Sequence, residues 1–314
     1  MKETFLKLAE NLSVDIVGFS PASRFAKENA IFKIYPDTKT VIGLAFRVLR
    51  GAYRGLEEGS TYYQYSTMGV ENLEEVMMPI ALLRLSQFLE ENGYIAVPQR
   101  LHQTIMAEEN QTNPEVAYNS IFRGVKRESQ MNFTDAAVQC GIGELGLSGK
   151  ILTDEYGPMV RYCFILTNAE FEATPLYKKH LCDGCKECIK GCPGHAISEE
   201  GKVDSWQCAV YYNGANGTRN PFFEPTVYQD IPERMKILNG EYQVNEDTAK
   251  EIMDNTYCYP PISHSYQSCI CGKSCVVDCY VHLERKGALT KKFKTEFRKR
   301  EKWFFNISDY KQEE

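Results

Sequence analysis

The pattern of apolar and polar residues over the first 170 positions predicts a layered domain of helices and strands. Residues 14–20 alternate in polarity as a half-buried strand does, whereas residues 40–46 are almost entirely apolar and predict a buried strand. Residues 1–12 predict an amphipathic helix. The apolar side of this helix carries Phe5, Leu8, Ala9 and Leu12.

Residues 72–93 contain a long apolar periodicity that predicts a further helix. Asn92 and Gly93 are residues that commonly terminate helices, and a short strand is expected next, at 94–98. The predicted buried face of this helix consists of Leu73, Met77, Ile80, Leu83 and Phe88.

More elements are expected before residue 170. A helix at 133–140 leads into a glycine-rich turn at 141–149, and a second turn at 155–158 precedes a strand at 160–167. The elements together predict an α+β or α/β layered domain of roughly 175 residues, and we assign the chain to the α+β class.

The glycine-rich turn GIGELGLSG has two interpretations. A Gly-x-Gly sequence occurs in dinucleotide-binding loops, but those loops follow a strand and open a helix. Here a helix comes before the glycines and an extended segment follows them. We therefore favour a tight turn that brings the backbone close to a large planar ligand.

Composition favours a folded protein in a reducing compartment. The chain has 314 residues, of which 43% are hydrophobic, and can form one large domain or two smaller ones. It shows no apolar run of transmembrane length and no secretory signal pattern, so we expect a cytoplasmic location and no membrane contact. Twelve cysteines in such a compartment favour metal binding over disulfides.

Residues 182–193 contain four cysteines in the spacing C-x2-C-x2-C-x3-C-P. Bacterial ferredoxins have this spacing, in which three thiolates bind one [4Fe–4S] cluster and the fourth binds a neighbouring cluster. Gly184 and Gly191 allow the backbone to turn closely around a cluster, and Pro193 interrupts any helix there. A structural zinc site is the alternative, although zinc usually takes two separated C-x2-C pairs.

A second cluster needs additional thiolates, which the chain supplies at residue 208 and within 268–280. This second motif is irregular, because C-x3-C-x3-C replaces C-x2-C spacing, and Cys269 could replace Cys271 as a ligand. Ferredoxin logic assigns Cys182, Cys185, Cys188 and Cys279 to one cluster, and Cys192, Cys208, Cys271 and Cys275 to the other.

The remaining cysteines are expected to have no ligand role. Cys258 is spare, while Cys140 and Cys163 lie in apolar segments where small buried side chains are expected. Two clusters close together can transfer electrons from one to the other at low potential. A ferredoxin needs only a fraction of this length, so we expect the first half of the chain to receive the electrons.

Charge is unevenly distributed along the chain. The formal net charge is −6, yet residues 284–302 (ERKGALTKKFKTEFRKREK) hold nine Lys and Arg against three acids. The solvent-exposed face of a helix is the favoured interpretation of such a run. An acidic redox partner or an RNA backbone are the alternatives.

The order of DIVGFSPASRF, GIGELGLSG, LTDEYGPMVR, ILT and the cysteine run resembles the catalytic core shared by epoxyqueuosine reductases and corrinoid reductive dehalogenases. The resemblance covers most of residues 1–285. It implies a nitroreductase-like α/β domain at 1–177 that binds base-off cobalamin. It further implies a ferredoxin-like domain with two [4Fe–4S] clusters at 178–283, interrupted by an insertion at 209–268. A basic helical tail is expected at 284–314.

The same resemblance implies site residues in the first domain. Glu128 falls near the position of a catalytic aspartate in epoxyqueuosine reductases, and Arg161 falls where dehalogenases carry an arginine that orients the proton donor. Tyr118 or His102 is the implied donor. Each of these also has an ordinary interpretation, as a surface residue or, for Arg161, as a structural ion-pair partner. The residues expected to contact the corrin are Gly141, Gly143, Leu145, Gly146, Tyr156 and Gly157.

The implied activity is reductive cleavage of a carbon–halogen or carbon–oxygen bond in a small organic substrate through cob(I)alamin. No Asp-x-His-x-x-Gly motif is present, so no histidine ligand to cobalt is expected. Epoxyqueuosine reduction in tRNA is an alternative, less favoured because the family's helical-repeat extension is missing after Cys279. The export signal of respiratory dehalogenases is also missing.

A third alternative is a non-catalytic electron-transfer protein or a reductive activator of a corrinoid protein. The expected electron donor is a ferredoxin or flavodoxin. The insertion at 209–268 is either a lid over the substrate cavity or an elaborated surface loop.

Overall fold

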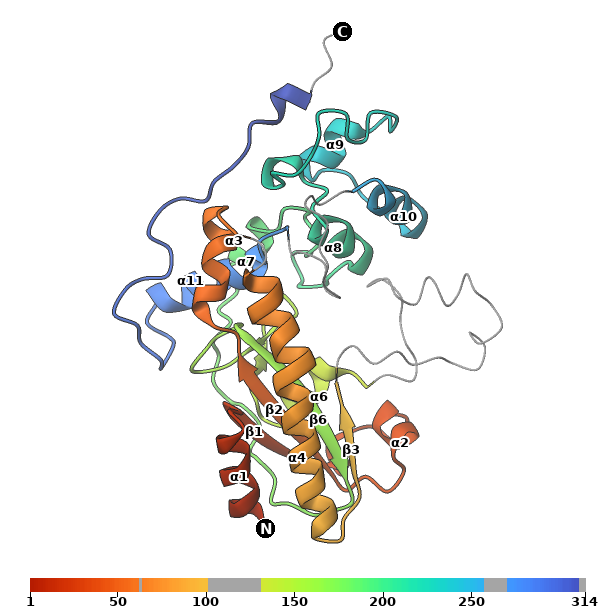
Figure 1. Cartoon of the computed structure of the whole chain (residues 1–314), viewed down its shortest axis with the longest axis vertical. Coiled ribbons are helices and arrows are strands. Elements are labelled where there is room, and N and C mark those ends of the chain that lie inside the picture. The colour runs from red at the N-terminus through yellow and green to blue at the C-terminus, as the bar shows by residue number, and fades with distance from the viewer. Residues whose placement is uncertain (62–63, 101–130, 257–269, 311–314) are drawn as a thin grey trace.

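The computed structural model describes residues 1–61, 64–100, 131–256 and 270–310 (Figure 1). Its largest sheet is four-stranded and antiparallel throughout, in the order β1-β2-β6-β3. The chain is therefore a mixed helix and sheet protein. The strands of this sheet are β1 (Ile16–Pro21), β2 (Thr40–Arg47), β3 (Ala96–Gln99) and β6 (Val160–Thr167).

One face of the sheet packs against two helices, α1 (Lys2–Asn11) and α4 (Met78–Glu91). Figure 1 shows α4 running along the length of the sheet. Side chains alternate along a strand, so β2 sends Ile42, Leu44 and Phe46 to this face, where all three are buried. Phe5 and Ala9 of α1 are also buried here, as the sequence predicted.

The opposite face of the sheet is covered by α6 (Phe133–Gln139) and α2 (Ala30–Ile34). Val41 and Ala45 of β2 point to this side. Both faces of β2 are therefore in core, which explains its almost continuous apolar sequence and confirms the predicted buried strand.

The predicted apolar face of the helix at 72–93 is wrong at Ile80 and Leu83, although Leu73 and Phe88 pack partly buried against the core. Ile80 and Leu83 are 48% and 57% exposed, because the helix turns a neighbouring stripe toward the sheet. Two wider π-helical turns, η3 (Tyr65–Glu71) and η4 (Leu73–Met77), precede α4 and change the register of the side chains. The residues that α4 buries are Met78, Ala81, Leu82, Leu85, Ser86 and Leu89.

The cysteine-bearing part lies above the sheet in Figure 1 and contains short helices joined by irregular segments. Helix α7 (Glu187–Lys190) contacts α11 (Ser274–Arg285), and both contain predicted cluster ligands. Helix α8 (Ser205–Tyr212) is capped by Asp204, whose carboxylate accepts a hydrogen bond from the Gln207 N–H at 2.9 Å.

Much of the insertion at 209–268 is ordered structure rather than a simple surface loop. Between Ala209 and residue 256 it contains the end of α8, α9 (Arg234–Asn239) and α10 (Glu246–Asp254). These helices share a core that includes Val210, Tyr211, Ile237, Leu238 and Ile252. A role as a lid stays a prediction.

The expected helical tail is also wrong for the described residues. Helix α11 ends at Arg285, and the chain from 286 to 306 is extended or turning, with a single 3-10 turn, η7 (Ile307–Tyr310), after it. The segment is instead tied to α3 (Arg54–Glu58) and its C-cap, Gly59. A Cβ at Gly59 would lie 2.4 Å from the Trp303 ring, and the φ of Gly59 is +68°.

Three further elements are short. Strands β4 (Glu144–Leu145) and β5 (Ile151–Leu152) form a short hairpin that contacts Cys182. A 3-10 turn, η2 (Arg50–Tyr53), connects β2 to α3. Within the described ranges, no helix has the length and apolarity needed to cross a membrane.

Candidate functional site

Four cysteines line a single cavity, and they are the four that the sequence assigns to one cluster. We call Cys182, Cys185, Cys188 and Cys279 the first quartet. The Leu147 N–H, next to the β4–β5 hairpin, donates to the sulfur of Cys182 at 3.3 Å. The N–H of a cluster-facing residue is a typical partner of a ligand sulfur.

The charged side chains around the first quartet form their own pairs. Asp183 accepts hydrogen bonds at 2.9 Å from His282 Nε2 and at 2.8 Å from Lys286 Nζ. Hydrogen bonds from Lys286 and His282 hold the pKa of Asp183 below its usual range. The ligand atoms of Asp183, His282 and Cys185 lie within 4.8 Å of one another, so this group belongs to the same site.

The other four assigned cysteines also lie together. The thiol of Cys275 interacts electrostatically with those of Cys271 and Cys208, and Cys192 interacts with Cys275 and Cys271. We call Cys192, Cys208, Cys271 and Cys275 the second quartet. Cys275 also interacts with Cys188 and Cys279 of the first quartet, so the two quartets are neighbours.

The two cysteine loops share a local conformation. Lys186 (φ 62°) and Lys273 (φ 48°) are both left-handed, and each immediately precedes the helix that carries the next cysteine. Left-handed backbone is costly for a lysine and is retained where the surroundings require it. The second motif, with C-x3-C spacing, therefore begins its helix with the same backbone conformation as the first motif, which has C-x2-C spacing. The additional residue is Gly272 (φ 69°).

Burial raises the pKa of both Cys188 and Cys192 to about 11. Neighbouring thiols add to the rise for both residues. Without a bound cation these two thiols are therefore protonated at neutral pH, and binding of a metal must release their protons. Two sets of four thiols fit two [4Fe–4S] clusters in ligand type and number.

Cys140 and Cys163 have the buried structural roles that the sequence predicted. Both have 0% exposure and lie in the core on either side of the sheet. The sulfur of Cys140 donates to the Val41 carbonyl at 3.4 Å, and burial raises the pKa of each thiol well above its usual value. Neither belongs to a quartet.

Arg161, a predicted catalytic residue, lies on β6 and pairs with Glu74 of η4. The side chains of Arg161 and Glu74 are 19% and 7% exposed. Burial alone would lower the pKa of Arg161, but the Glu74 carboxylate outweighs it and holds the guanidinium charged. The structure thus shows the ion pair that was one interpretation of Arg161, and a catalytic role for it stays a prediction.

Aromatic residues surround this ion pair. Tyr65 and Tyr212 interact electrostatically with Arg161, and the Tyr53 ring lies 4.8 Å from that of Tyr65. Lys273 Nζ lies 4.7 Å from the centre of the Tyr212 ring. We call Arg161, Glu74, Tyr53, Tyr65 and Tyr212 the buried polar cluster.

The buried polar cluster adjoins the second quartet. Tyr212 is on α8, the helix that carries Cys208, and Lys273 lies between Cys271 and Cys275 in sequence. Sequence reasoning missed Glu74, because a glutamate in a helical pattern is usually on the exposed side. The only available signal was its position beside Leu73 in an apolar-periodic segment.

The predicted corrin contacts do not gather around one cavity in the described ranges. A Cβ on Gly141 would lie 2.4 Å from the Pro175 carbonyl oxygen, and one on Gly143 would lie 2.2 Å from that of Leu152. These glycines make room for the chain's own backbone. Gly146 lines the first quartet's cavity, Leu145 is 55% exposed, and Gly157 packs against Leu283 and Leu289.

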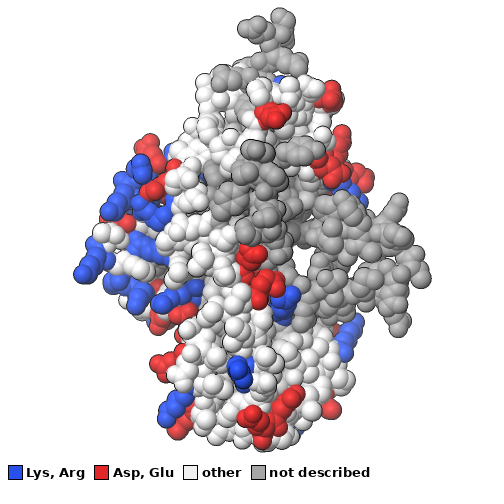
Figure 2. All heavy atoms as spheres, viewed as in Figure 1, with Lys and Arg blue, Asp and Glu red and all other residues white. Residues whose placement is uncertain are grey.

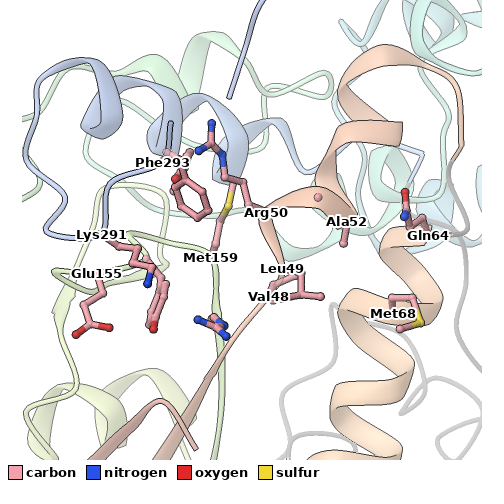
Figure 3. A pocket seen from close by; sticks show the side chains of 14 residues that line it. Val48, Leu49, Arg50, Ala52, Gln64, Met68, Glu155, Met159, Lys291 and Phe293 are labelled. Atoms are coloured by element: carbon pink, nitrogen blue, oxygen red, sulfur yellow. The ribbon is translucent and has the colours of Figure 1, made fainter. Parts of the chain in front are cut away.

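Tyr156, the remaining predicted corrin contact, lines a cavity of about 500 Å³, a size typical of small-molecule sites (Figure 3). Its hydroxyl donates to Asp15 at 3.2 Å. Burial, followed by interactions with Glu155 and Asp15, raises the pKa of Tyr156 to about 12. Figure 3 shows the cavity between Lys291 and Phe293 on one side and Gln64 and Met68 on the other.

Five residues named in the sequence analysis lie outside the described residues. They are the predicted catalytic residues Glu128, Tyr118 and His102, and the cysteines Cys258 and Cys269.

Comparison with known proteins gives relatives of two kinds, although no family model matches the chain. An 81-residue segment is 37% identical to the epoxyqueuosine reductase of Listeria monocytogenes, covering 25% of this chain and 21% of that protein. A 67-residue segment is 37% identical to the tetrachloroethene reductive dehalogenase of Desulfitobacterium hafniense, covering 20% and 12%. Segments of the chain are thus similar in sequence to both groups of reductases.

Solved structures with a similar fold include members of the same two groups. The epoxyqueuosine reductase from Streptococcus thermophilus matches over 85% of this chain and 68% of its own, with 14% identity and a TM-score of 0.46. A catabolic reductive dehalogenase bound to 3-bromo-4-hydroxybenzoic acid matches over 81% and 35%, with 14% identity and a TM-score of 0.49. The chain matches only between 12% and 34% of the length of these curated relatives.

Proposed function

We propose that the protein is an iron–sulfur reductase in which two [4Fe–4S] clusters carry electrons toward the buried polar cluster. The convergence of two neighbouring cysteine quartets is the observation that carries this proposal. The first quartet would hold one cluster and the second quartet the other. Bound clusters of this type supply one-electron transfers at low potential.

The residues of the buried polar cluster determine what the site offers to a reacting molecule. Glu74 keeps the Arg161 guanidinium in place and charged, in surroundings from which bulk water is largely excluded. A fixed positive charge in such a site stabilises negative charge that develops on a leaving group. The tyrosines beside it supply hydroxyl groups that can donate a proton.

Reductive cleavage of a carbon–halogen or carbon–oxygen bond in a small organic substrate is the reaction we propose. The names of both groups of relatives support a reductase. Epoxyqueuosine reduction in tRNA is the second candidate, because epoxyqueuosine reductases are among the curated relatives. A ferredoxin or flavodoxin is the proposed electron donor, and a cytoplasmic location is part of the same proposal.

Cobalamin joins this proposal through the sequence resemblance alone. When bound in a reductase, it supplies a strongly nucleophilic, low-potential metal centre. Two of the glycines predicted to contact it, Gly141 and Gly143, lie against the chain's own backbone, so no step of the reaction is derived through it.

Anaerobic reconstitution with iron and sulfide, followed by addition of cobalamin, tests the proposed function. We expect two clusters per chain and, with cobalamin, the electron paramagnetic resonance (EPR) signal of base-off Co(II). The reduced protein is then assayed with organohalides, epoxides and an epoxyqueuosine-containing tRNA stem–loop. A protein that binds zinc in place of iron would contradict the proposal. Clusters with no cobalamin signal and no turnover would leave only an electron carrier.

A further inference from the structure

The basic segment after α11 is held against the body of the protein by two of its own cations. Arg298 pairs with Asp278 of α11 at 2.5 Å and with Glu57 of α3, and Lys302 pairs with Asp278 at 2.6 Å. Both carboxylates are 7% exposed. These buried pairs fix the path of the segment, which contains no α-helix of its own.

The other six cations of the segment and Arg285, at the end of α11, are exposed. Figure 2 shows Lys and Arg side chains gathered at the left of the molecule, where Figure 1 places the chain that follows α11. Phe293, which is 48% exposed, lies among these cations, and the Arg50 guanidinium lies 4.2 Å from the centre of its ring. We define the basic surface as Arg285, Lys286, Lys291, Lys292, Lys294, Lys299 and Arg300.

The basic surface begins directly at the first quartet. Lys286 contacts Asp183, which follows Cys182 and lines the quartet's cavity. Farther along, the Thr290 N–H donates to the Asp154 carbonyl at 2.8 Å, and Lys179 pairs with the carboxylate of the same residue at 2.7 Å. Exposed lysines before the quartet and after α11 therefore lie on one side of the molecule.

Acidic side chains on the other side of the quartet pair with their own lysines. Lys186 pairs with Glu199, and Lys190 pairs with Glu187 at 2.8 Å. That side presents both signs of charge. The side formed by the basic surface presents an excess of positive charge, which attracts a protein of opposite sign and orients it during encounter.

We propose that the basic surface is the docking site of a small acidic electron carrier, of the flavodoxin or ferredoxin class, and that the first quartet's cluster receives its electron. In this step the reduced carrier loses one electron and the cluster gains it, with no transfer of atoms or protons. The inference rests on the proposed function, because it requires clusters in the quartets.

The observations favour an acidic protein over RNA as the partner. The basic surface borders the first quartet, which lies farther from the buried polar cluster than the second quartet does. An incoming electron has to arrive at the first quartet. Electron transfer slows steeply with distance, so a carrier benefits from docking at this position. RNA binding does not depend on the neighbouring thiols. RNA makes its tight contacts with proteins through both its phosphates and its stacked bases.

Two triple variants of equal charge test the proposal in the reconstituted full-length chain. One is Lys292→Gln/Lys294→Gln/Lys299→Gln in the basic surface. The matched control is Lys7→Gln/Lys27→Gln/Lys33→Gln, three exposed lysines of the sheet domain. The probes are an acidic flavodoxin and an RNA stem–loop. Binding to the oxidised proteins is followed by calorimetry, and reduction by the flavodoxin hydroquinone is followed by stopped flow.

At low salt, we expect the first triple variant to associate with flavodoxin and to accept its electron about tenfold more slowly than the native protein does. The dependence of these rates on salt concentration should be shallower in the variant. The control should behave as the native protein does. Equal losses in both variants, or none in the first, would overturn the proposal. So would loss of RNA binding with flavodoxin binding unchanged.

Two further measurements separate this test from that of the proposed function. Iron content and reduction by dithionite, a small reductant that needs no docking surface, should be the same in all three proteins. Absence of clusters would contradict the proposed function. A third outcome is that dithionite reduces the clusters normally and the carrier reduces them equally well in both variants. This outcome would contradict the docking site but not the proposed function.

Discussion

The two cysteine quartets differ in what surrounds them. The first lies beside exposed charged groups, including Asp183 and Lys286. The second lies beside Tyr212 and Lys273, which connect it to buried groups at the end of the sheet. Two sets of identical ligands are therefore placed in contrasting environments.

This contrast predicts the direction of electron transfer, from the first quartet to the second. An exposed, charged setting suits exchange of electrons with a partner, whereas a buried, aromatic setting suits delivery to a reaction from which water is excluded. The neighbouring positions of Cys188 and Cys275 connect the two. The predictions below test whether the quartets have separate roles.

Removal of one thiol from each quartet should have the largest effect. Each of Cys279→Ala and Cys275→Ala should lower the iron content from about eight to about four atoms per chain. In Cys279→Ala, the carrier should no longer reduce the remaining cluster quickly, although dithionite still does. In Cys275→Ala, rapid reduction by the carrier should persist.

Cys140→Ala is the control for these variants, because this thiol is buried outside both quartets. It should retain all of its iron. Unchanged iron in Cys279→Ala would remove that residue from the ligand set.

Substitution of Glu74 should have the next largest effect. Glu74→Gln leaves the Arg161 charge without its partner, so we expect the free energy of unfolding to fall by about 3–5 kcal/mol. Chemical denaturation of the cluster-loaded protein measures this change. The matched control is Lys39→Gln, which breaks the exposed Lys39–Glu170 pair and should leave stability essentially unchanged. Similar results for both variants would contradict a buried polar cluster.

A smaller loss of stability is expected from Gly191→Ala. Its Cβ would lie 1.8 Å from a carboxylate oxygen of Asp278, the residue that anchors the basic segment. The strain should cost about 1–3 kcal/mol of unfolding free energy. Gly184→Ala offers a comparison in which the added methyl meets nothing within 4 Å but the φ of +72° is strained. A stable Gly191→Ala protein with normal carrier docking would contradict this packing.

The smallest effect concerns Tyr156. Its pKa of about 12 lies above the value of about 10 for an unfolded tyrosine. The raised pKa stabilises the folded protein below pH 10, and this contribution is lost as the pH rises toward 12. The ultraviolet titration of the native protein minus that of Tyr156→Phe gives the ionisation of Tyr156 alone. We expect this difference signal to appear near pH 12. A difference signal centred at pH 10 would contradict the burial of this hydroxyl.

The sequence indicated which cysteines lie close together because the spacing within each motif is a local property, while their role as cluster ligands stays a prediction. Cysteines two to three residues apart can only reach a shared centre through tight turns, and the left-handed Lys186 and Lys273 provide such turns. The almost continuous apolar pattern of β2 was equally informative, since both of its faces are buried.

Features that depend on distant residues were not predictable from pattern. The partner of Arg161 lies 87 positions earlier in the chain, and the π-helical turns before α4 changed which stripe of that helix is buried. The segment after α11 was expected to be helical from its charge pattern. Its buried pairs with Asp278 and Glu57 determine an extended path instead.

Iron analysis combined with EPR of the fully reduced protein tests the central claim most directly. Two occupied quartets in adjacent positions predict about eight irons per chain and a spectrum broadened by magnetic interaction between two reduced [4Fe–4S] clusters. About four irons, or two signals with no interaction between them, would contradict the account.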